Sequence, residues 1–142
     1  MSSKDCTFCA IAGGSLPAEV VYQDGRFIAF LDTRPVFLGH TLIVPRAHID
    51  DIFGLDAALH GPLLGLAQAV SRALVEGLGC QGVFLAMNNR VSQSVPHLHL
   101  HAVPRSKGDG LRGFFWPRQK YPSDVAREEV AAKIRASLPR IE

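Results

Sequence analysis

The 142-residue sequence lacks the features that mark membrane, secreted and strongly nucleic-acid-binding proteins. No unbroken apolar run is longer than five residues, whereas a membrane-spanning helix needs roughly 20. No apolar stretch follows the charged N-terminal residues, so no secretory signal is expected. The formal net charge of +2 is too small for a protein held to nucleic acid by phosphate contacts alone. We therefore expect a cytoplasmic protein with neither a membrane nor a nucleic acid as its main partner.

Cysteine is also scarce, with only Cys6, Cys9 and Cys80 in the chain. Three cysteines cannot all pair within one chain, and a cytoplasmic protein keeps its thiols reduced. Cys80 follows the helix-ending Gly79 and is expected to be a small buried residue. Cys6 and Cys9 have the Cys-x-x-Cys spacing of a zinc site or a redox pair, but the βαβ context of redox pairs is missing.

What the sequence does contain is enough apolar material for one folded core. Apolar residues make up 47% of the chain and charged residues 20%, a composition typical of globular proteins. A chain of this length buries about two thirds of its surface on folding, which supports one core and not two. We expect a single domain over residues 1–142, with its core in about 5–105 and a basic, aromatic loop and C-terminal helix in 105–142.

The order of the predicted elements indicates an α+β fold. Apolar residues from Leu55 to Gly79 recur every three or four positions, which predicts one long helix. Asp24-Gly25 predicts a two-residue hairpin turn. The other predicted elements are helices at 5–12 and 123–138 and strands at 20–23, 26–31, 41–45, 82–88 and 96–104. We expect a mainly antiparallel sheet of five to six strands with helices on one face, and strand 82–88 covered on both sides.

Three histidines, His97, His99 and His101, form the most informative pattern in the chain. Because side chains alternate along a strand, the three imidazoles share one face and the residues between them share the other. Three half-buried imidazoles without a function would be costly. Two of them can ligate a metal, or one can act as a nucleophile, since neutral imidazole has a free lone pair at cytoplasmic pH. The spacing alone leaves both interpretations open.

The surroundings of these histidines resemble one known family. Gln93-Ser94-Val95 precedes His-Leu-His-Leu-His-Ala-Val at residues 97–103, and together they resemble the signature of the histidine triad family of nucleotide hydrolases and transferases. Further similar segments are residues 6–11, 21–22, 29–32, 35 and 39–48. The resemblance covers roughly the first 105 residues and implies the histidine triad fold and a homodimer.

The resemblance also implies a hydrolase with a covalent intermediate. His99 is expected to attack the α-phosphorus of a nucleotide and form a nucleotidyl-histidine, from which water releases the nucleoside monophosphate. The bond cleaved is expected to be a phosphoanhydride or a phosphoramidate. The other residues of the expected site are the catalytic His40, Ser94, His97 and His101 and the nucleotide-binding Asp32, Asn88, Gln93, Ser94, His99 and His101. Ser92 departs from the family pattern, which commonly has glycine there.

A metal site is a further implication of the resemblance. In related proteins two cysteines combine with two histidines, which here are Cys6, Cys9, His48 and His97. Two thiolates and two imidazoles suit tetrahedral zinc, and four protein ligands leave no position for a reacting water. We expect a structural zinc and no organic cofactor. His60 is expected to face the solvent.

The segment after the histidines bears on the substrate. Residues 104–109, Pro-Arg-Ser-Lys-Gly-Asp, are similar to the continuation found in the dinucleoside polyphosphate hydrolase branch. Residues 104–142 hold nine basic and five acidic groups, so the loop is either a solvated surface or a binding surface for a polyphosphate. Phe114, Phe115 and Trp116 can stack on a base, pack in the core or contact a partner subunit.

Two alternatives to the covalent hydrolase remain at this point. One is a metal-dependent hydrolase with zinc on His97 and His99. The other is a nucleotide-binding or zinc-stabilised interaction module without turnover. The covalent mechanism requires an uncharged His99 with a free ring nitrogen. A ring turned into the interior, or one with both nitrogens engaged, would contradict it.

Overall fold

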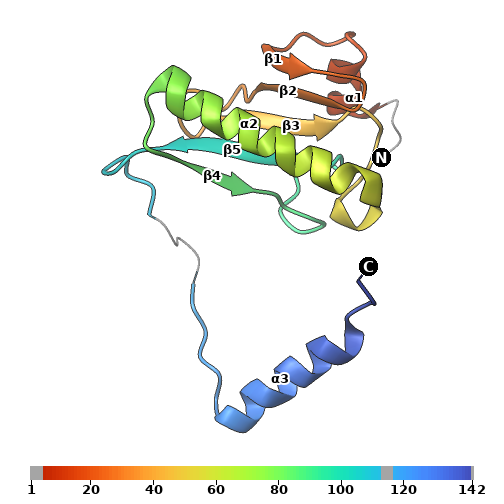
Figure 1. Cartoon of the computed structure of the whole chain (residues 1–142), viewed down its shortest axis with the longest axis vertical. Helices are drawn as coiled ribbons and strands as arrows, with labels where there is room; N and C mark the ends of the chain where they lie inside the picture. Colours follow the sequence, from red (N-terminus) through yellow and green to blue (C-terminus); the bar gives the residue numbers. More distant parts are fainter. Residues whose placement is uncertain (1–4, 113–116, 142) are drawn as a thin grey trace. The chain divides into compact units, whose positions relative to one another are not determined.

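Five strands form one antiparallel sheet in the computed structural model, which describes residues 5–112 and 117–141 (Figure 1). Their bounds are β1 Val20–Gln23, β2 Phe27–Leu31, β3 Thr41–Pro45, β4 Gly82–Ala86 and β5 Leu100–Arg105. The spatial order is β1-β2-β3-β5-β4, and every neighbouring pair is antiparallel. The predicted α+β fold with an antiparallel sheet is confirmed, at the lower of the two expected strand numbers.

The β1–β2 hairpin forms where the sequence predicts it, but its tip is one residue further along. The bend lies at Gly25 and Arg26 instead of at Asp24 and Gly25. The Asp24 carboxylate accepts hydrogen bonds from the backbone N–H groups of Arg26 and Phe27, at 2.7 and 2.8 Å. The side chain of Asp24 therefore closes the turn. The Asp-Gly signal for a two-residue turn considers only the backbone and does not include this interaction.

The long helix α2 spans His60–Leu78 and starts five residues later than predicted. Two short 3-10 turns, η2 (Ile52–Gly54) and η3 (Ala57–Leu59), precede it. Asp56 caps η3, accepting a hydrogen bond from the backbone N–H of Ala58. The end of α2 is as predicted, because Gly79 adopts the left-handed conformation with φ 74° that favours glycine.

Helices lie on both faces of the sheet, which corrects the prediction of one covered face. On one face α2 buries Leu63, Ala67, Val70 and Leu74 against β2, β3 and β5. On the other face the short helix α1 (Thr7–Ala12) covers a second core. The buried residues of that core are Cys6, Phe8, Ile28, Phe30, Leu42 and Val44. Successive residues of β2 and β3 alternate between the two cores, as the pleat requires.

The two strands nearest the histidines differ from the prediction. β4 is an outer strand with half-buried side chains, and Leu85 is 40% exposed, so the prediction of cover on both faces is wrong. β5 starts at Leu100 instead of Pro96. Before it, the backbone N–H of Leu98 donates to the carbonyl of Ile49 at 2.7 Å, outside the sheet. His97 and His99 therefore precede the strand that holds His101.

The chain divides into two compact units, Met1–Asp109 and Gly110–Glu142. The second unit holds the predicted C-terminal helix, α3 (Asp124–Ser137), which Ser123 caps by accepting a hydrogen bond from the backbone N–H of Ala126 at 3.1 Å. The described residues between β5 and α3 contain no helix or strand, as expected of the long loop. Phe114, Phe115 and Trp116 lie outside the described residues. Across residues 5–112 and 117–141, no helix has the length and apolar character needed to cross a membrane.

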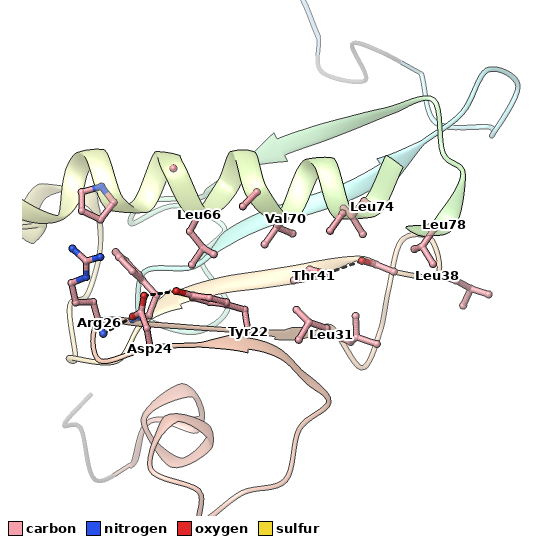
Figure 2. A pocket seen from close by; sticks show the side chains of 17 residues that line it. Tyr22, Asp24, Arg26, Leu31, Leu38, Thr41, Leu66, Val70, Leu74 and Leu78 are labelled. Carbon is pink, nitrogen blue, oxygen red and sulfur yellow. Dashed lines mark hydrogen bonds between the residues drawn. The ribbon is translucent and has the colours of Figure 1, made fainter. Parts of the chain in front are cut away.

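An apolar groove of about 820 Å³ lies between α2 and the first three strands (Figure 2). Leu66, Val70 and Leu74 of α2 line one wall, and Tyr22 and Leu31 line the other. The side chains that the groove shares with the α2 core place it on the α2 face of the sheet.

Candidate active site and metal cluster

The histidines of the sequence pattern gather on the α1 face of the sheet, away from the apolar groove. The ring centroids of His99 and His101 are 5.0 Å apart, and Phe8 of α1 stands edge-on to His99 at 5.0 Å. His97 and His99 are buried, with 0% and 4% of their surface exposed. The residues between the histidines belong to the core under α2, in agreement with the predicted alternation.

The hydrogen bond of His99 decides which of its ring nitrogens carries the proton. Nδ1 lies 2.7 Å from the carbonyl oxygen of His97, and a carbonyl only accepts, so Nδ1 is protonated and donates. In the neutral ring the lone pair is then on Nε2. Nε2 makes no hydrogen bond within the described residues, where no buried side-chain nitrogen or oxygen lacks a partner. Nε2 is therefore not fully buried, although His99 as a whole is only 4% exposed.

Hydrogen bonds from Val36 through His40 determine which ring nitrogen of His101 carries the proton. The backbone N–H of Val36 donates to Nδ1 of His40 at 3.1 Å, which leaves the His40 proton on Nε2. This Nε2 lies 2.9 Å from Nδ1 of His101 and donates to it. His101 consequently carries its own proton on Nε2. The site thus offers an N–H donor on one ring and a lone pair on the next.

Burial keeps the supporting rings uncharged at neutral pH. It lowers the pKa of His40, although the charge of Asp32 acts in the opposite direction. Burial, followed by repulsion from His99 and His40, lowers the pKa of His101 to about 4. The pKa of His97 is also lowered, mainly by burial. His101 is therefore a neutral hydrogen-bond donor at neutral pH and not a cation.

Asp32 lies at the outer end of this hydrogen-bond chain. Its Oδ2 is 3.7 Å from Nε2 of His40, and its Oδ1 accepts a hydrogen bond from the backbone N–H of Arg34 at 2.9 Å. The Asp32 side chain is 22% exposed. A carboxylate oxygen has more than one lone pair, so this group can also accept hydrogen bonds from ligand hydroxyls.

The loop before the histidines carries three further predicted site residues. Asn88 and Ser94 are exposed, and the Asn88 amide donates to the carbonyl of Ser92 at 3.0 Å. The side-chain amide of Gln93 is hydrogen-bonded to backbone at both of its ends. Ser92 has a φ of 57°, in the left-handed region that glycine adopts freely and serine does not. The histidine triad signature commonly has glycine at this position, and the positive φ gives a physical reason for that preference.

Cys6, Cys9, His48 and His97 form a compact cluster in which the four potential ligand atoms lie within 4.8 Å of one another. Nδ1 of His97 is 3.3 Å from Sγ of Cys6, and Nδ1 of His48 is 3.2 Å from Sγ of Cys9. Tetrahedral zinc, with bonds of about 2.3 Å to sulfur and 2.0 Å to nitrogen, holds such atoms about 3.5 Å apart. The spacing of the donor atoms therefore fits zinc.

Hydrogen bonds outside the cluster orient both of its histidines. Nε2 of His97 donates to the carbonyl of Pro45 at 2.8 Å, and Nε2 of His48 donates to the Asp50 carboxylate at 2.9 Å. Both protons are thus on Nε2, and the lone pairs of Nδ1 face the sulfur atoms. Such second hydrogen bonds are typical of zinc-bound histidines. His99 lies outside the cluster, so the geometry does not favour a metal held by His97 and His99.

The segment similar to the polyphosphate hydrolase branch forms a turn at the far end of β5. Arg105 makes two hydrogen bonds to the Asp109 carboxylate, at 2.6 and 3.1 Å, and Asp109 also accepts one from the backbone N–H of Ser106. A rise of about 3.3 Å per residue places Arg105 roughly 20 Å along the strand from His99. The beginning of the basic loop is therefore a structural turn, distant from the histidine rings.

Three further features are the surroundings of Cys80, those of His60, and a second group of possible metal ligands. Cys80 packs beside the α2 core but is only half-buried, whereas the sequence predicted a buried residue. His60 is exposed, and its Nε2 donates to the carbonyl of Leu55 at 3.2 Å. Asp32, His40 and His101 also lie close enough to hold a metal, but both ring nitrogens of His40 and Nδ1 of His101 already take part in the hydrogen-bond chain.

Several contributors to the site were not predicted. Asp50 orients His48 from two residues further along the chain, and a carboxylate at that spacing from a suspected ligand is a signal that can be found in the sequence. Phe8 packs against His99 and lies between the two cysteines in sequence. The backbone carbonyls of Pro45 and His97 leave no signal, because every residue has a carbonyl.

Comparison with protein families matches residues 14–108 to the HIT domain. The chain is 33% identical over 141 residues to the Bacillus subtilis protein named hit, covering 97% of this chain and 94% of that protein. The adenosine 5′-monophosphoramidase of Schizosaccharomyces pombe is 29% identical, covering 92% of this chain and 98% of that protein. The Arabidopsis thaliana adenylylsulfatase is 31% identical, covering 76% of this chain and 56% of that protein.

Solved structures share the fold described above. A crystal structure of a HIT family member from Bacillus subtilis has a TM-score of 0.85 at 29% identity, and the match covers 96% of this chain and 99% of that chain. The crystal structure of a zinc-bound histidine triad family protein from Mycobacterium smegmatis has a TM-score of 0.74 at 34% identity. That match covers 96% of this chain and 100% of the other.

Proposed function

The chain belongs to the HIT domain family, and on this premise we propose that it is a nucleotide hydrolase that forms a covalent nucleotidyl-histidine on His99. The observation that carries the proposal is the hydrogen bond from Nδ1 of His99 to the carbonyl of His97 at 2.7 Å. It leaves Nε2 with the lone pair that a nucleophile needs. The relatives named monophosphoramidase and adenylylsulfatase support a hydrolytic reaction of a nucleotide.

The proposed reaction has two steps at one phosphorus atom. In the first, Nε2 of His99 attacks the α-phosphorus, the phosphorus–nitrogen bond forms, and the leaving group departs with its electron pair. In the second, water attacks the same phosphorus and loses a proton to solvent, and the phosphorus–nitrogen electron pair returns to Nε2. The Nε2–H of His101 donates to the phosphoryl oxygens, and the hydroxyl of Ser94 donates to the leaving group. His40 keeps His101 in the tautomer that donates.

The substrate class follows from the groups around His99. Asp32 accepts hydrogen bonds from the ribose hydroxyls, and Asn88 contacts the phosphate or the ribose. The bond cleaved is an α-phosphoanhydride, as in dinucleoside polyphosphates, or a phosphoramidate of a purine nucleoside monophosphate. The pairing of Arg105 with Asp109 removes one argument for the polyphosphate, because this guanidinium is already bonded and lies at the far end of β5.

We also propose that Cys6, Cys9, His48 and His97 hold a structural zinc ion. Zinc would supply cross-links and no reaction step there, because four protein ligands complete its coordination. His97 has two functions in this arrangement, since its ring faces the cluster and its carbonyl orients His99. The donor set and the zinc-bound relative from Mycobacterium smegmatis support the assignment.

A homodimer formed along β4 is the proposed assembly. β4 has no neighbouring strand on its outer side within the described residues, and Leu85 on it is 40% exposed. Val75 of α2 and Val83 of β4 line one shallow hollow beside this edge. Pairing β4 with its copy would extend the sheet across the two chains and cover these side chains. A solution mass of two chains by light scattering is the expected result.

The test of the reaction is the mass of the intact protein, quenched after brief exposure to a dinucleoside polyphosphate or a nucleoside phosphoramidate. We expect the wild type to gain the mass of one nucleotidyl group and the His99→Asn variant to gain none. His60→Asn is the matched control, because His60 is exposed and remote from the rings, and it is expected to form the adduct. Turnover by His99→Asn would refute the mechanism. Binding of AMP by a wild type that cleaves neither substrate would support the nucleotide-binding module instead.

A further inference from the structure

The loop that leads to the histidines, residues 88–95, has an unusual backbone. Arg90 and Ser92 both have positive φ angles, 73° and 57°, and they are the only residues other than glycine to do so in the described part of the chain. Side chains with a Cβ atom rarely adopt this conformation, so a loop that holds two of them must be fixed by its contacts. These contacts identify the residue that determines the shape of the loop.

Gln93 makes the two central contacts. Its Nε2 donates to the carbonyl of Asp50 at 2.6 Å, and its Oε1 accepts a hydrogen bond from the backbone N–H of Arg90 at 3.0 Å. The first bond ties the loop to a segment distant in sequence, and the second holds Arg90 in its left-handed conformation. Both ends of the amide are thus bonded to the backbone, which differs from the direct nucleotide contact expected from the sequence.

Further contacts join the same two segments. The side chain of Asn89 accepts a hydrogen bond from the backbone N–H of Ile52 at 2.8 Å. The Arg90 guanidinium lies 4.0 Å from the ring centroid of Phe53 and 3.4 Å from the Asp51 carboxylate. These contacts are exposed, as are the two hydrogen bonds of Gln93. Gln93 differs because its one side chain joins two backbone groups, the carbonyl of Asp50 and the N–H of Arg90.

The segment to which Gln93 is attached begins at the metal cluster. His48 belongs to the cluster and donates to the side chain of Asp50, whose backbone carbonyl accepts from Gln93. The next carbonyl toward His48, that of Ile49, accepts from the backbone N–H of Leu98. Residues 48–53 are thus held at the cluster and form the frame on which the loop rests.

We propose that Gln93 is a positioning residue that holds the hydroxyl of Ser94 in place for the reaction, by tying loop 88–95 to the segment that follows His48. This inference rests on the proposed function. Ser94 is exposed, so the course of the backbone on either side of it decides where its hydroxyl lies. Gln93 is the adjacent residue and fixes that course at two points.

The test is a double-mutant cycle of Gln93→Met and Ser94→Ala, with initial rates measured on a nucleoside phosphoramidate. Methionine keeps the length of the side chain and removes both hydrogen bonds. We expect each single variant to lower kcat/KM by about 10- to 100-fold, since a small misplacement of a reacting group has effects of this size. The double variant is expected to be no worse than Ser94→Ala alone, because a displaced loop costs nothing further once the hydroxyl is absent.

Gln81→Met is the matched control. Gln81 also closes a loop with its side chain, accepting from the backbone N–H of Lys107 at 2.7 Å, but it does so at the far end of β5. We expect this variant to keep kcat/KM within about twofold of the wild type, because surface changes away from the site have small effects. Gln93→Glu keeps the acceptor for Arg90 and loses the donor to Asp50, so its rate is expected to fall between those of the wild type and Gln93→Met.

Three outcomes would overturn the positioning function. One is an unchanged rate in Gln93→Met, and another is a double variant whose loss is the product of the two single losses. The third is a Gln93→Met protein that loses bound zinc or unfolds at a clearly lower temperature, which would assign Gln93 a general structural function. If the wild type itself forms no nucleotidyl adduct, the proposed function fails. An adduct that forms equally well in Gln93→Met overturns only the inference about Gln93.

Discussion

His101 makes the stability of the fold depend on pH in a way that can be measured. Burial, with repulsion from His99 and His40, lowers its pKa from 6.5 to about 4. Between these pH values the unfolded chain binds a proton at this residue and the folded chain does not. Protonation of His101 in the unfolded chain therefore does not reduce the stability of the fold above pH 6.5, and it reduces this stability progressively as the pH falls toward 4. The free energy of unfolding falls by about 1.4 kcal/mol per pH unit in this window, or about 3 kcal/mol in all.

The assay is urea unfolding of the wild type and of His101→Gln at about pH 7 and pH 4.5. Glutamine does not titrate, so we expect the variant to lose about 2 to 3 kcal/mol less stability than the wild type over this interval. Burial lowers the pKa of His40 and His97 as well, but both residues are present in both proteins. Their contributions to the pH dependence of the unfolding free energy therefore largely cancel when the two proteins are compared. An equal loss in the two proteins would refute the description of His101 as a buried neutral ring.

Two further predictions concern the metal cluster and the turn after β5. Elemental analysis of the purified proteins is expected to find one zinc per chain in the wild type and in His99→Asn, and none in Cys9→Ser. Because metal binding is coupled to folding, a chelator is expected to lower the unfolding temperature of the two zinc-containing proteins. Zinc missing from His99→Asn would contradict the assignment of the cluster. Arg105→Ala is expected to lower the unfolding temperature only slightly, through the lost pair with Asp109, and to leave kcat/KM for a dinucleoside polyphosphate within about twofold. A tenfold rise in KM for the polyphosphate alone would place Arg105 at the substrate after all.

Most elements follow from interactions between neighbours along the chain. The cap at Ser123 and the end of α2 at Gly79 involve groups within one helical turn, so local sequence predicts them. The errors lie where another contact competes with the local pattern. β5 begins later than predicted because the N–H of Leu98 bonds the carbonyl of Ile49, a residue far away in sequence. The tip of the hairpin moves because the Asp24 side chain replaces a backbone partner.

The prediction about the faces of the sheet was wrong for a related reason. A helix of six residues, such as α1, has too short an apolar pattern to predict which layer it joins. The packing of Phe8 against Phe30 and His99 places α1 on the face opposite α2. That packing brings the Cys-x-x-Cys segment to the histidines. The helix α1, which the prediction did not place on the second face of the sheet, is thus also the element that completes the metal cluster.

The spacing of histidines, cysteines and apolar residues is a local property of the chain, and it is sufficient to identify the family and the fold class. Which nitrogen of His97 and of His101 carries a proton depends instead on contacts that exist only in the folded protein. His40 reaches His101 across 61 residues, and Pro45 reaches His97 across 52. Hydrogen-bond partners that distant along the chain meet only after the strands have paired, and they determine whether a given nitrogen of these two rings donates or accepts. His99 differs, because the carbonyl that orients it belongs to a residue only two positions away.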